Sequence, residues 1–357
     1  MRNTTYINAL RFPLALLVVF IHTYNASWQL IETGSAPTPA YFAARVLPTF
    51  AVPMFFAVSG YLFFLNIRDF TTDTYIDKLR RRMLTLIVPY VVWNIIAFGL
   101  YALQDFSAGR ALQYALSPDL FWGCRNLGGE SVNAFGWIVG ATTAPVQQPL
   151  WFVRDLIVLA MLSPLFYAAL RHRIIGRIVL LLLGAVYYGE FWPNPGGVSF
   201  MGPWFFGLGA WAGIRRMDVP AATRPALKPA LALLPVCGVA LMWFPDGDDI
   251  IHLAAQGVYV FAAMISAVHI ASFFTQHRRP SRLWADSSFF VYAAHTILLL
   301  PLTKWVAPRV ADCGTWAQGL VYLACAFTAA VLCVAVYAVL QHYLPRASAP
   351  LTGQFGR

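Results

Sequence analysis

The chain has 357 residues, of which 59% are hydrophobic and only 11% are charged. A soluble domain carries about 25% charged residues, so this composition excludes an ordinary soluble protein and indicates an integral membrane protein. Five cysteines are too few for a secreted disulfide scaffold. The net charge of +10 has no solvated basic face to carry it, which excludes a nucleic-acid-binding protein and calls for another explanation.

Apolar stretches recur along the whole chain, and the roughly 20 residues that cross a bilayer as a helix fit about ten times. The stretches lack the alternation of membrane β-strands, and backbone groups in lipid must be paired internally, so we expect helices. The sequence therefore predicts an all-α fold, a polytopic membrane bundle of about ten transmembrane helices. The expected spans are about residues 8–28, 46–66, 84–104, 149–170, 174–191, 199–214, 227–244, 251–274, 284–302 and 316–341.

Basic residues are concentrated on one side of this arrangement. With the N-terminus inside, most of the 25 Lys and Arg residues fall in cytoplasmic segments such as 78–82 and 278–282, as the positive-inside rule requires. The net charge thus indicates topology, and an even number of spans places both termini in the cytoplasm. We expect one transmembrane domain over residues 1–345 and a short cytoplasmic tail over 346–357. The first apolar segment lacks a clear cleavage site, which favours a retained helix.

The first expected helix contains two ionisable residues, Arg11 and His22. An ionisable residue within a span is costly and is therefore a candidate for function. The two residues are separated by about 20° after whole turns and by about 16 Å along the helix axis. They should form a polar stripe from the cytoplasmic boundary into the outer half of the membrane. The simpler alternatives are a boundary arginine that extends to the interface and a hydrogen-bonded packing histidine.

The second and third expected helices carry a pair of small residues and a basic run. Ser59 precedes Gly60, and small residues let another helix or a ligand approach closely, with helix packing as the simpler interpretation. Arg80, Arg81 and Arg82 precede the third span. They either anchor the helix at the cytoplasmic face or bind an anion, since guanidinium groups pair bidentately with phosphate.

The fourth expected span begins on the outer side with Trp151, Arg154 and Asp155. Trp151 alone is typical of an interfacial aromatic residue. By depth, Asp155 could meet His22, where a carboxylate would fix the tautomer of the imidazole and raise its basicity. Because sequence neighbours do not face each other on a helix, we expect Arg154 and Asp155 to serve different partners.

In the ninth expected span, Tyr292 and His295 share a helix face and lie near the expected depth of His22. The sequence has no HExxH motif and no CxxC spacing, so we expect no metal site. It also lacks the glycine loop of nucleotide-binding enzymes and the GxSxG nucleophile elbow.

Taken in order, these motifs resemble those of the acyltransferase family 3 membrane proteins over nearly the whole chain. The most specific element is the spacing of Arg11 and His22 in the first helix. The others are Pro-x-Phe-Phe-x-x-Ser-Gly-Tyr at 53–61, Arg82 followed by Pro-Tyr and Trp-Asn at 89–94, Leu-Trp-Phe-x-Arg-Asp-Leu at 150–156, and Ser-x-x-x-Tyr-x-x-His at 288–295.

The resemblance implies a multi-pass enzyme of the bacterial inner membrane. Such an enzyme transfers an acyl group, expected to be acetyl, from acyl-coenzyme A on the cytoplasmic side to a hydroxyl of an extracytoplasmic glycan or lipid-linked oligosaccharide. Acetyl-coenzyme A is then a co-substrate, and no tightly bound cofactor is expected. Carried over by position, His22 is the catalytic histidine, Arg11 is its basic partner, Arg82 belongs to the donor patch, and Trp151 and His295 line the site. Together with the residue-level arguments above, the expected catalytic residues are His22, Arg11, Asp155 and His295, the expected donor-binding residues are Arg80, Arg81, Arg82 and Tyr90, and the expected substrate-binding residues are Ser59, Trp151, Arg154 and Tyr292.

Two other classes of protein stay open on the residues alone. A transporter or flippase of glycan or lipid precursors also holds polar residues inside a bundle, although we find no internal repeat of the kind common in transporters. A structural subunit of a polysaccharide assembly complex would use the histidines for packing. The expected partners are the lipid bilayer, an acyl-coenzyme A and a glycan acceptor, with no nucleic acid.

Overall fold

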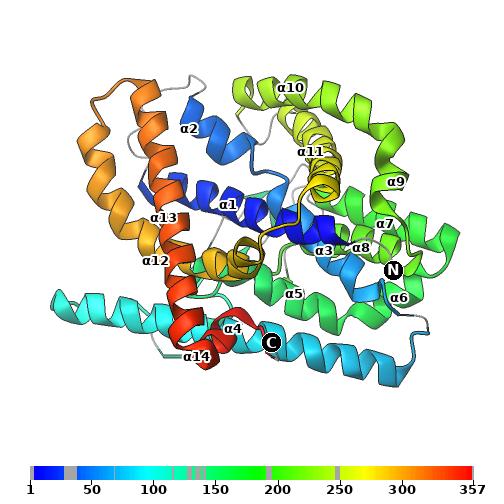
Figure 1. Ribbon diagram of the computed structural model, residues 1–357, viewed down its shortest axis with the longest axis horizontal. Helices are drawn as coiled ribbons and strands as arrows, with labels where there is room; N and C mark the ends of the chain where they lie inside the picture. Colours follow the sequence, from blue (N-terminus) through cyan, green and yellow to red (C-terminus); the bar gives the residue numbers. More distant parts are fainter. Residues whose placement is uncertain are drawn as a thin grey trace. The chain divides into compact units, whose positions relative to one another are not determined.

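A computed structural model describes residues 4–27, 38–67, 69–114, 116–126, 131–132, 138–139, 142–189, 195–245 and 250–355 (Figure 1). This part of the chain is mainly helical, as the sequence predicts, and each of the ten expected spans contains helix. Residue 28 of the first expected span and residues 190–191 of the fifth lie outside the described residues.

The elements follow one another along the chain with short connections. They are α1 (Thr5–Ser27), α2 (Pro39–Tyr41), the π-helix η2 (Phe42–Val46), α3 (Ala51–Phe64), α4 (Thr72–Ser107), η3 (Pro118–Phe121), β1 (Arg125–Asn126), β2 (Ser131–Val132), β3 (Ile138–Val139), β4 (Thr143–Ala144), η4 (Gln148–Leu150), α5 (Trp151–Met161), α6 (Ser163–Leu170), α7 (Arg173–Tyr188), η5 (Pro195–Gly197), α8 (Met201–Ile214), α9 (Val219–Thr223), η6 (Arg224–Ala226), α10 (Leu227–Trp243), α11 (Ile250–His277), α12 (Arg282–Val310), α13 (Thr315–Tyr343) and α14 (Pro345–Thr352).

Seven helical stretches of the described chain are long and apolar enough to cross a membrane. The pair α5 and α6, which is bent by 60°, makes an eighth if it forms a single span. The helices α7 and α8 have only 16 and 14 residues, fewer than the roughly 20 that a span needs. Several apolar residues of α8 are buried within the protein, and hydropathy alone does not separate such a helix from one that faces lipid.

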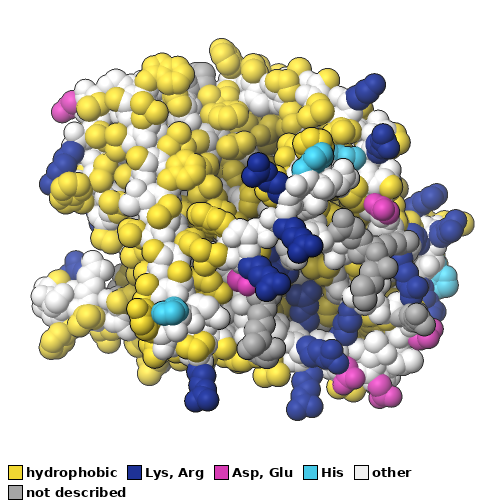
Figure 2. Space-filling model, viewed as in Figure 1, with side chains coloured by type: hydrophobic (Ala, Val, Ile, Leu, Met, Phe, Trp, Pro, Cys, Tyr) yellow, Lys and Arg dark blue, Asp and Glu magenta, His cyan; other side chains and the backbone are white. Residues whose placement is uncertain are grey.

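Large apolar side chains remain exposed on the long helices, as a membrane protein requires. Examples are Leu103 on α4, Phe273 on α11 and Trp316 on α13, each with more than three fifths of its surface accessible. Figure 2 shows hydrophobic side chains over much of the visible face. Apolar surface on this scale would drive a soluble protein to aggregate and is suited to contact with lipid. The protein is therefore a multi-pass membrane protein.

The described residues pack into two compact units. Unit 1 comprises Met1–Phe55 and Asp218–Tyr343, and unit 2 comprises Phe56–Met217 and Leu344–Arg357. In unit 1, α1 packs along α11, α12 and α13, and α10 packs along α11 (Figure 1). The buried Tyr322 hydroxyl of α13 donates to the Phe20 carbonyl of α1 over 2.6 Å, which fixes α1 close to His22.

In unit 2, α3 and α8 approach each other backbone to backbone at glycines. A Cβ added at Gly60 would lie 2.1 Å from the Phe206 carbonyl oxygen, and one added at Gly209 would lie 1.8 Å from the Ala57 carbonyl oxygen. Only a residue without a side chain permits this separation. The glycine after Ser59 therefore serves helix packing, which was the simpler interpretation of the sequence.

The C-terminal segment, expected as a short tail, forms part of unit 2 in its described portion. Helix α14 packs against α4, where the indole nitrogen of Trp93 donates to the Leu351 carbonyl over 2.9 Å. Gly353 follows with a φ of 69°, and a Cβ there would lie 2.2 Å from the Thr85 carbonyl oxygen. Residues 356–357 lie outside the described residues.

Four two-residue strands, which the sequence analysis does not predict, lie between α4 and α5. Strand β1 pairs antiparallel with β4, with Arg125 opposite Ala144, and β2 pairs antiparallel with β3. They fall between the third and fourth expected spans, at residues 105–148, of which residues 115, 127–130, 133–137 and 140–141 lie outside the described residues. The β1–β4 pair brings Trp122 and Thr143 to the first turn of α5.

Candidate active site

Helices α1 and α12 of unit 1 run side by side in the same direction. The Phe12 ring lies 4.4 Å from the Trp284 ring between centroids, and the His22 ring lies 5.1 Å from the His295 ring. These contacts are separated by ten residues on α1 and eleven on α12, so the two helices stay in register over about three turns. The structure thus confirms that His22 and His295 lie at a similar depth, and it shows in addition that their rings are neighbours.

The ring of His295 is held in one tautomer. Its side chain is buried, and its Nδ1 lies 3.0 Å from the Val291 carbonyl oxygen. A carbonyl only accepts hydrogen bonds, so Nδ1 carries the hydrogen and Nε2 of the neutral ring carries the lone pair. Nε2 is buried and has no hydrogen-bond partner within the described chain. An unpaired buried acceptor is costly, which makes Nε2 a candidate acceptor for a hydrogen bond from a neighbouring donor.

Two aromatic rings, those of Tyr292 and Phe55, follow one another on the side of His295. The buried Tyr292 ring lies 6.5 Å from the His295 ring and 6.3 Å from the Phe55 ring, between centroids. The shared helix face that the sequence predicts for Tyr292 and His295 is therefore confirmed.

Arg11 and His22 lie on one continuous helix, as the sequence predicts. Helix α1 runs unbroken through both residues despite Pro13, and both side chains are half-buried. Eleven residues of α-helix bring them back to nearly the same face, about 16 Å apart along the axis. One face of α1 thus carries the cation of Arg11 at one end and His22 at the other.

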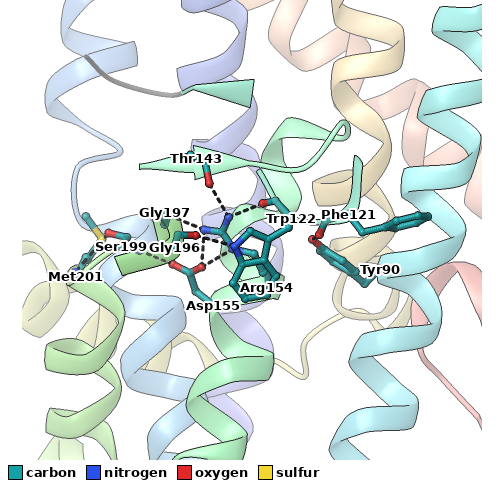
Figure 3. Close-up of polar contacts among 10 residues, drawn as sticks. All are labelled: Tyr90, Phe121, Trp122, Thr143, Arg154, Asp155, Gly196, Gly197, Ser199 and Met201. Carbon is teal, nitrogen blue, oxygen red and sulfur yellow. Dashed lines mark hydrogen bonds and ion pairs between the residues drawn. The ribbon is translucent and has the colours of Figure 1, made fainter. Parts of the chain in front are cut away.

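A second polar cluster lies in unit 2, around the first turn of α5 (Figure 3). Arg154 donates to Asp155 Oδ1 through Nε over 3.0 Å and through Nη2 over 2.8 Å. It also donates to the Trp122 carbonyl, the Thr143 hydroxyl and the Gly197 carbonyl. All five N–H groups of the guanidinium are therefore satisfied within the protein.

The expectation that Arg154 and Asp155 serve different partners is wrong, because the two side chains form a buried ion pair with each other. The rule that sequence neighbours diverge on a helix concerns the directions of their Cβ atoms, and the long arginine side chain folds back over its own turn. Asp155 Oδ2 accepts a hydrogen bond from the Ser199 backbone nitrogen over 2.9 Å. Asp155 and His22 belong to different units, so their pairing stays a prediction.

Tyr90 lies beside the Arg154 cluster (Figure 3). Its buried hydroxyl donates to the Phe121 carbonyl, which precedes Trp122. Arg82 lies eight residues earlier on α4, about 12 Å along the axis. The structure therefore does not bring Tyr90 together with the basic run as a donor-binding group. Within that run, Arg80 and Arg81 are exposed and Arg82 is half-buried, and all three lie inside α4, more than two turns after its start at Thr72.

The remaining expected site residues are Ser59 and Trp151, both half-buried in unit 2. The Trp151 ring lies 6.3 Å from the Phe56 ring between centroids, which places it close to α3. Their proposed contact with substrate stays a prediction.

Sequence reasoning assigned no role to several residues around these sites. Asn94, a buried amide within a span, accepts from the Gln147 backbone nitrogen over 3.1 Å and donates to the Tyr90 carbonyl over 2.8 Å. Its polarity within a span was a usable signal. Trp122 binds Arg154 through its backbone carbonyl, which no side-chain pattern reveals.

Comparison with known proteins identifies the family of the chain. A family model described as an acyltransferase domain matches residues 4–339. The succinoglycan biosynthesis protein ExoH of Rhizobium meliloti (strain 1021) is 28% identical over 359 residues, which cover 97% of this chain and 91% of that protein. No solved structure matches significantly. The chain therefore belongs to the acyltransferase family 3 and is a multi-pass membrane enzyme of the O-acyltransferase type.

Proposed function

We propose that this enzyme transfers an acetyl group from acetyl-coenzyme A, bound from the cytoplasm, to a hydroxyl of an extracytoplasmic or lipid-linked polysaccharide. Family membership supports the reaction class, and the name of the Rhizobium relative supports an exopolysaccharide acceptor. The observation that carries the assignment of the site is the pairing of His22 with His295, whose Nε2 is buried with an unused lone pair.

His22 is the catalytic histidine in this proposal. Its imidazole accepts the proton of the acceptor hydroxyl while the hydroxyl oxygen attacks the thioester carbonyl. The carbon–sulfur bond then breaks, and the coenzyme A thiolate takes the proton from the imidazolium. In the alternative route, the imidazole attacks the thioester, the carbon–sulfur bond breaks and the coenzyme A thiolate leaves with an acyl-imidazole formed. The hydroxyl then attacks the acyl-imidazole, the carbon–nitrogen bond breaks, and the hydroxyl proton passes to the thiolate, directly or through the freed imidazole. Both routes consume the lone pair of a neutral His22.

His295 orients His22 in either route. Two imidazoles joined by an N–H···N bond have centroids about 5 Å apart, since such bonds are about 2.9 Å long. The observed separation of 5.1 Å allows that bond once the His22 ring turns toward Nε2 of His295. In this bond an N–H group of His22 donates to Nε2 of His295, which fixes the tautomer of His22. The other ring nitrogen of His22 then carries the lone pair that accepts the proton.

The donor is assigned to the cations of the inner side. Arg80, Arg81 and Arg82 would pair with its phosphates, and Arg11 would guide the pantetheine arm along the face of α1 toward His22. We place the enzyme in the bacterial inner membrane with both termini cytoplasmic. About ten crossings then require α7 and α8 to cross as short helices.

The proposal is tested in cells that lack this protein. Compositional analysis of their surface polysaccharide should show loss of an ester-linked acetyl group, restored by the wild-type gene and not by His22→Ala. Equal amounts of both proteins in the membrane fraction serve as the control. Unchanged acetylation of the polysaccharide in the deleted strain would contradict the proposed function.

A further inference from the structure

Three arginines of unit 2 meet where the start of α7 contacts the end of α8. A Cβ added at Gly176 of α7 would lie 2.2 Å from the ring of Trp211, so that ring packs directly on the α7 backbone. Arg173 and Arg177 flank this glycine and share one face of α7, since they are four residues apart. Arg215 follows Trp211 by four residues, immediately after the last turn of α8.

The guanidinium group of Arg215 is fixed in place. Its Cζ lies 3.1 Å from the centroid of the Trp211 ring, and its Nη1 donates to the Leu170 carbonyl over 3.0 Å. Its Nη2 is buried and has no hydrogen-bond partner in the described chain. A rigid cation with an unfilled, buried donor is arranged to receive an acceptor that the protein itself does not supply.

The positive charges of this cluster are close enough to act on one another. Burial, together with the charges of Arg173 and Arg177, lowers the pKa of Arg215 below its ordinary value. None of the three makes an ion pair with a carboxylate in the part of the chain that is described. Figure 2 shows Lys and Arg side chains gathered where α6 and α7 lie. An external anion would relieve the mutual repulsion.

The surface next to the cluster indicates the kind of anion. Ile174, Ile178 and Leu181 are 73%, 51% and 74% exposed, and their spacing places them on one face of α7. An apolar face thus extends along α7 from the turn that carries the arginines. A soluble phosphate would use only the cations, whereas a phospholipid places its phosphate on the cations and its acyl chains along the apolar face.

We propose that Arg173, Arg177 and Arg215 bind the headgroup phosphate of an anionic phospholipid, whose acyl chains lie along α7. The site is formed by residues other than the donor residues at 80–82 and does not depend on the acyl-transfer reaction. It would hold the start of α7 at the membrane surface, where the short length of this helix leaves its position in the bilayer poorly set by hydropathy alone.

The test measures lipid binding to the purified, delipidated full-length protein by native mass spectrometry. Phosphatidylglycerol is titrated against phosphatidylcholine with the same acyl chains. We expect Arg173→Gln with Arg177→Gln to weaken phosphatidylglycerol binding at least tenfold, since a basic residue near a charged membrane contributes roughly 1 kcal/mol. The matched control removes the same charge at the exposed Arg278 and Arg279, and it should change binding less than twofold.

A second probe, adenosine 3′,5′-bisphosphate, carries the phosphates of a soluble coenzyme and no acyl chain. We expect it to leave phosphatidylglycerol bound at this site. Displacement of the lipid by the bisphosphate would overturn the lipid assignment in favour of a soluble phosphate. The proposal would also be overturned if the double variant, with the same melting temperature as the wild type, bound phosphatidylglycerol with equal affinity. The three arginines would then not form a lipid site.

Discussion

His295 differs from His22 in the way its ring is held. The Val291 carbonyl fixes the hydrogen of His295 on Nδ1, while no such bond to the His22 ring is present among the described residues. A fixed ring beside a turnable one suits a positioning residue beside a catalytic residue. The sequence could place both histidines at similar depth from the helical period, but the tautomer of His295 depends on a contact that only coordinates reveal.

The tautomer can be tested with His295→Asn. The asparagine amide can still donate to the Val291 carbonyl but offers no acceptor where Nε2 lies. We expect kcat to fall about 100-fold, toward the lower end of what an acid–base group contributes, with little change in melting temperature. The control is Thr303→Val, which removes a similar buried bond to the Leu299 carbonyl on the same helix. Wild-type kcat in His295→Asn would show that Nε2 is not used.

At the scale of elements, the Arg154 cluster fastens three segments to the first turn of α5. Its hydrogen bonds reach Trp122, which follows η3, and Thr143 of strand β4. They also reach Gly197 and Ser199 in the turn before α8. From this geometry we expect Arg154 to position these three segments. Direct binding of substrate by Arg154 would require it to give up one of these bonds.

We expect Arg154→Gln to destabilise the protein by about 3–5 kcal/mol, because it leaves the buried Asp155 carboxylate without its counter-ion. The double variant Arg154→Gln with Asp155→Asn removes that charge as well and should recover part of the loss. Thermal unfolding of the detergent-solubilised proteins measures both. If the double variant is no more stable than Arg154→Gln alone, the unpaired carboxylate is not the source of the effect.

The contact between α3 and α8 is tested with Gly209→Ala. Its methyl group would meet the Ala57 carbonyl, so the helices must separate, at a cost of about 1–3 kcal/mol. Gly99→Ala on α4 is the matched control, since a Cβ there meets no atom within 4 Å. That substitution should leave the melting temperature equal or higher, because alanine is favoured over glycine in helices by about 1 kcal/mol. Equal effects of both substitutions would contradict the close packing.

The sequence predicts which segments are helical better than it predicts whether each helix crosses the membrane and which residues its side chains contact. The apolar runs at 174–191 and 199–214 do form helices, yet α7 and α8 are too short to be assigned as spans on length alone. The sequence predicts that Arg154 and Asp155 point apart, because helix geometry gives only the directions in which their side chains leave the backbone. It does not include a long arginine side chain that folds back over its own turn. The other partners of Arg154 come from residues 122, 143 and 197, a long-range arrangement that no local pattern encodes.

For the whole molecule, the distribution of basic residues predicts that the turn between α12 and α13 faces outward. Cys313 lies exposed in that turn, so a membrane-impermeant maleimide should label it in intact spheroplasts. Arg278→Cys on the predicted inner side, placed in a variant without the native cysteines, should react only after the membrane is opened. Labelling of residue 278 from outside would reverse the proposed topology.

Cys124, in the expected outer segment, should react more slowly than Cys313 in the same experiment. It is half-buried, and burial raises the pKa of its thiol above the ordinary value, which lowers the fraction of reactive thiolate at neutral pH. Its labelling rate should rise as the pH increases toward that raised pKa. A rate for Cys124 that equals the rate for Cys313 at neutral pH would contradict this burial.

Acyl transfer that depends on His22 is the claim on which the functional account rests. The most direct measurement uses inverted membrane vesicles, whose cytoplasmic face is exposed to the medium. They are incubated with radiolabelled acetyl-coenzyme A, and the label in the polysaccharide fraction is counted. Vesicles with the wild-type protein should transfer label, and vesicles with equal amounts of folded His22→Ala should transfer at least 100-fold less. Label at the wild-type rate in the His22→Ala vesicles would contradict the account. Its absence with both proteins would favour a transporter or a structural subunit.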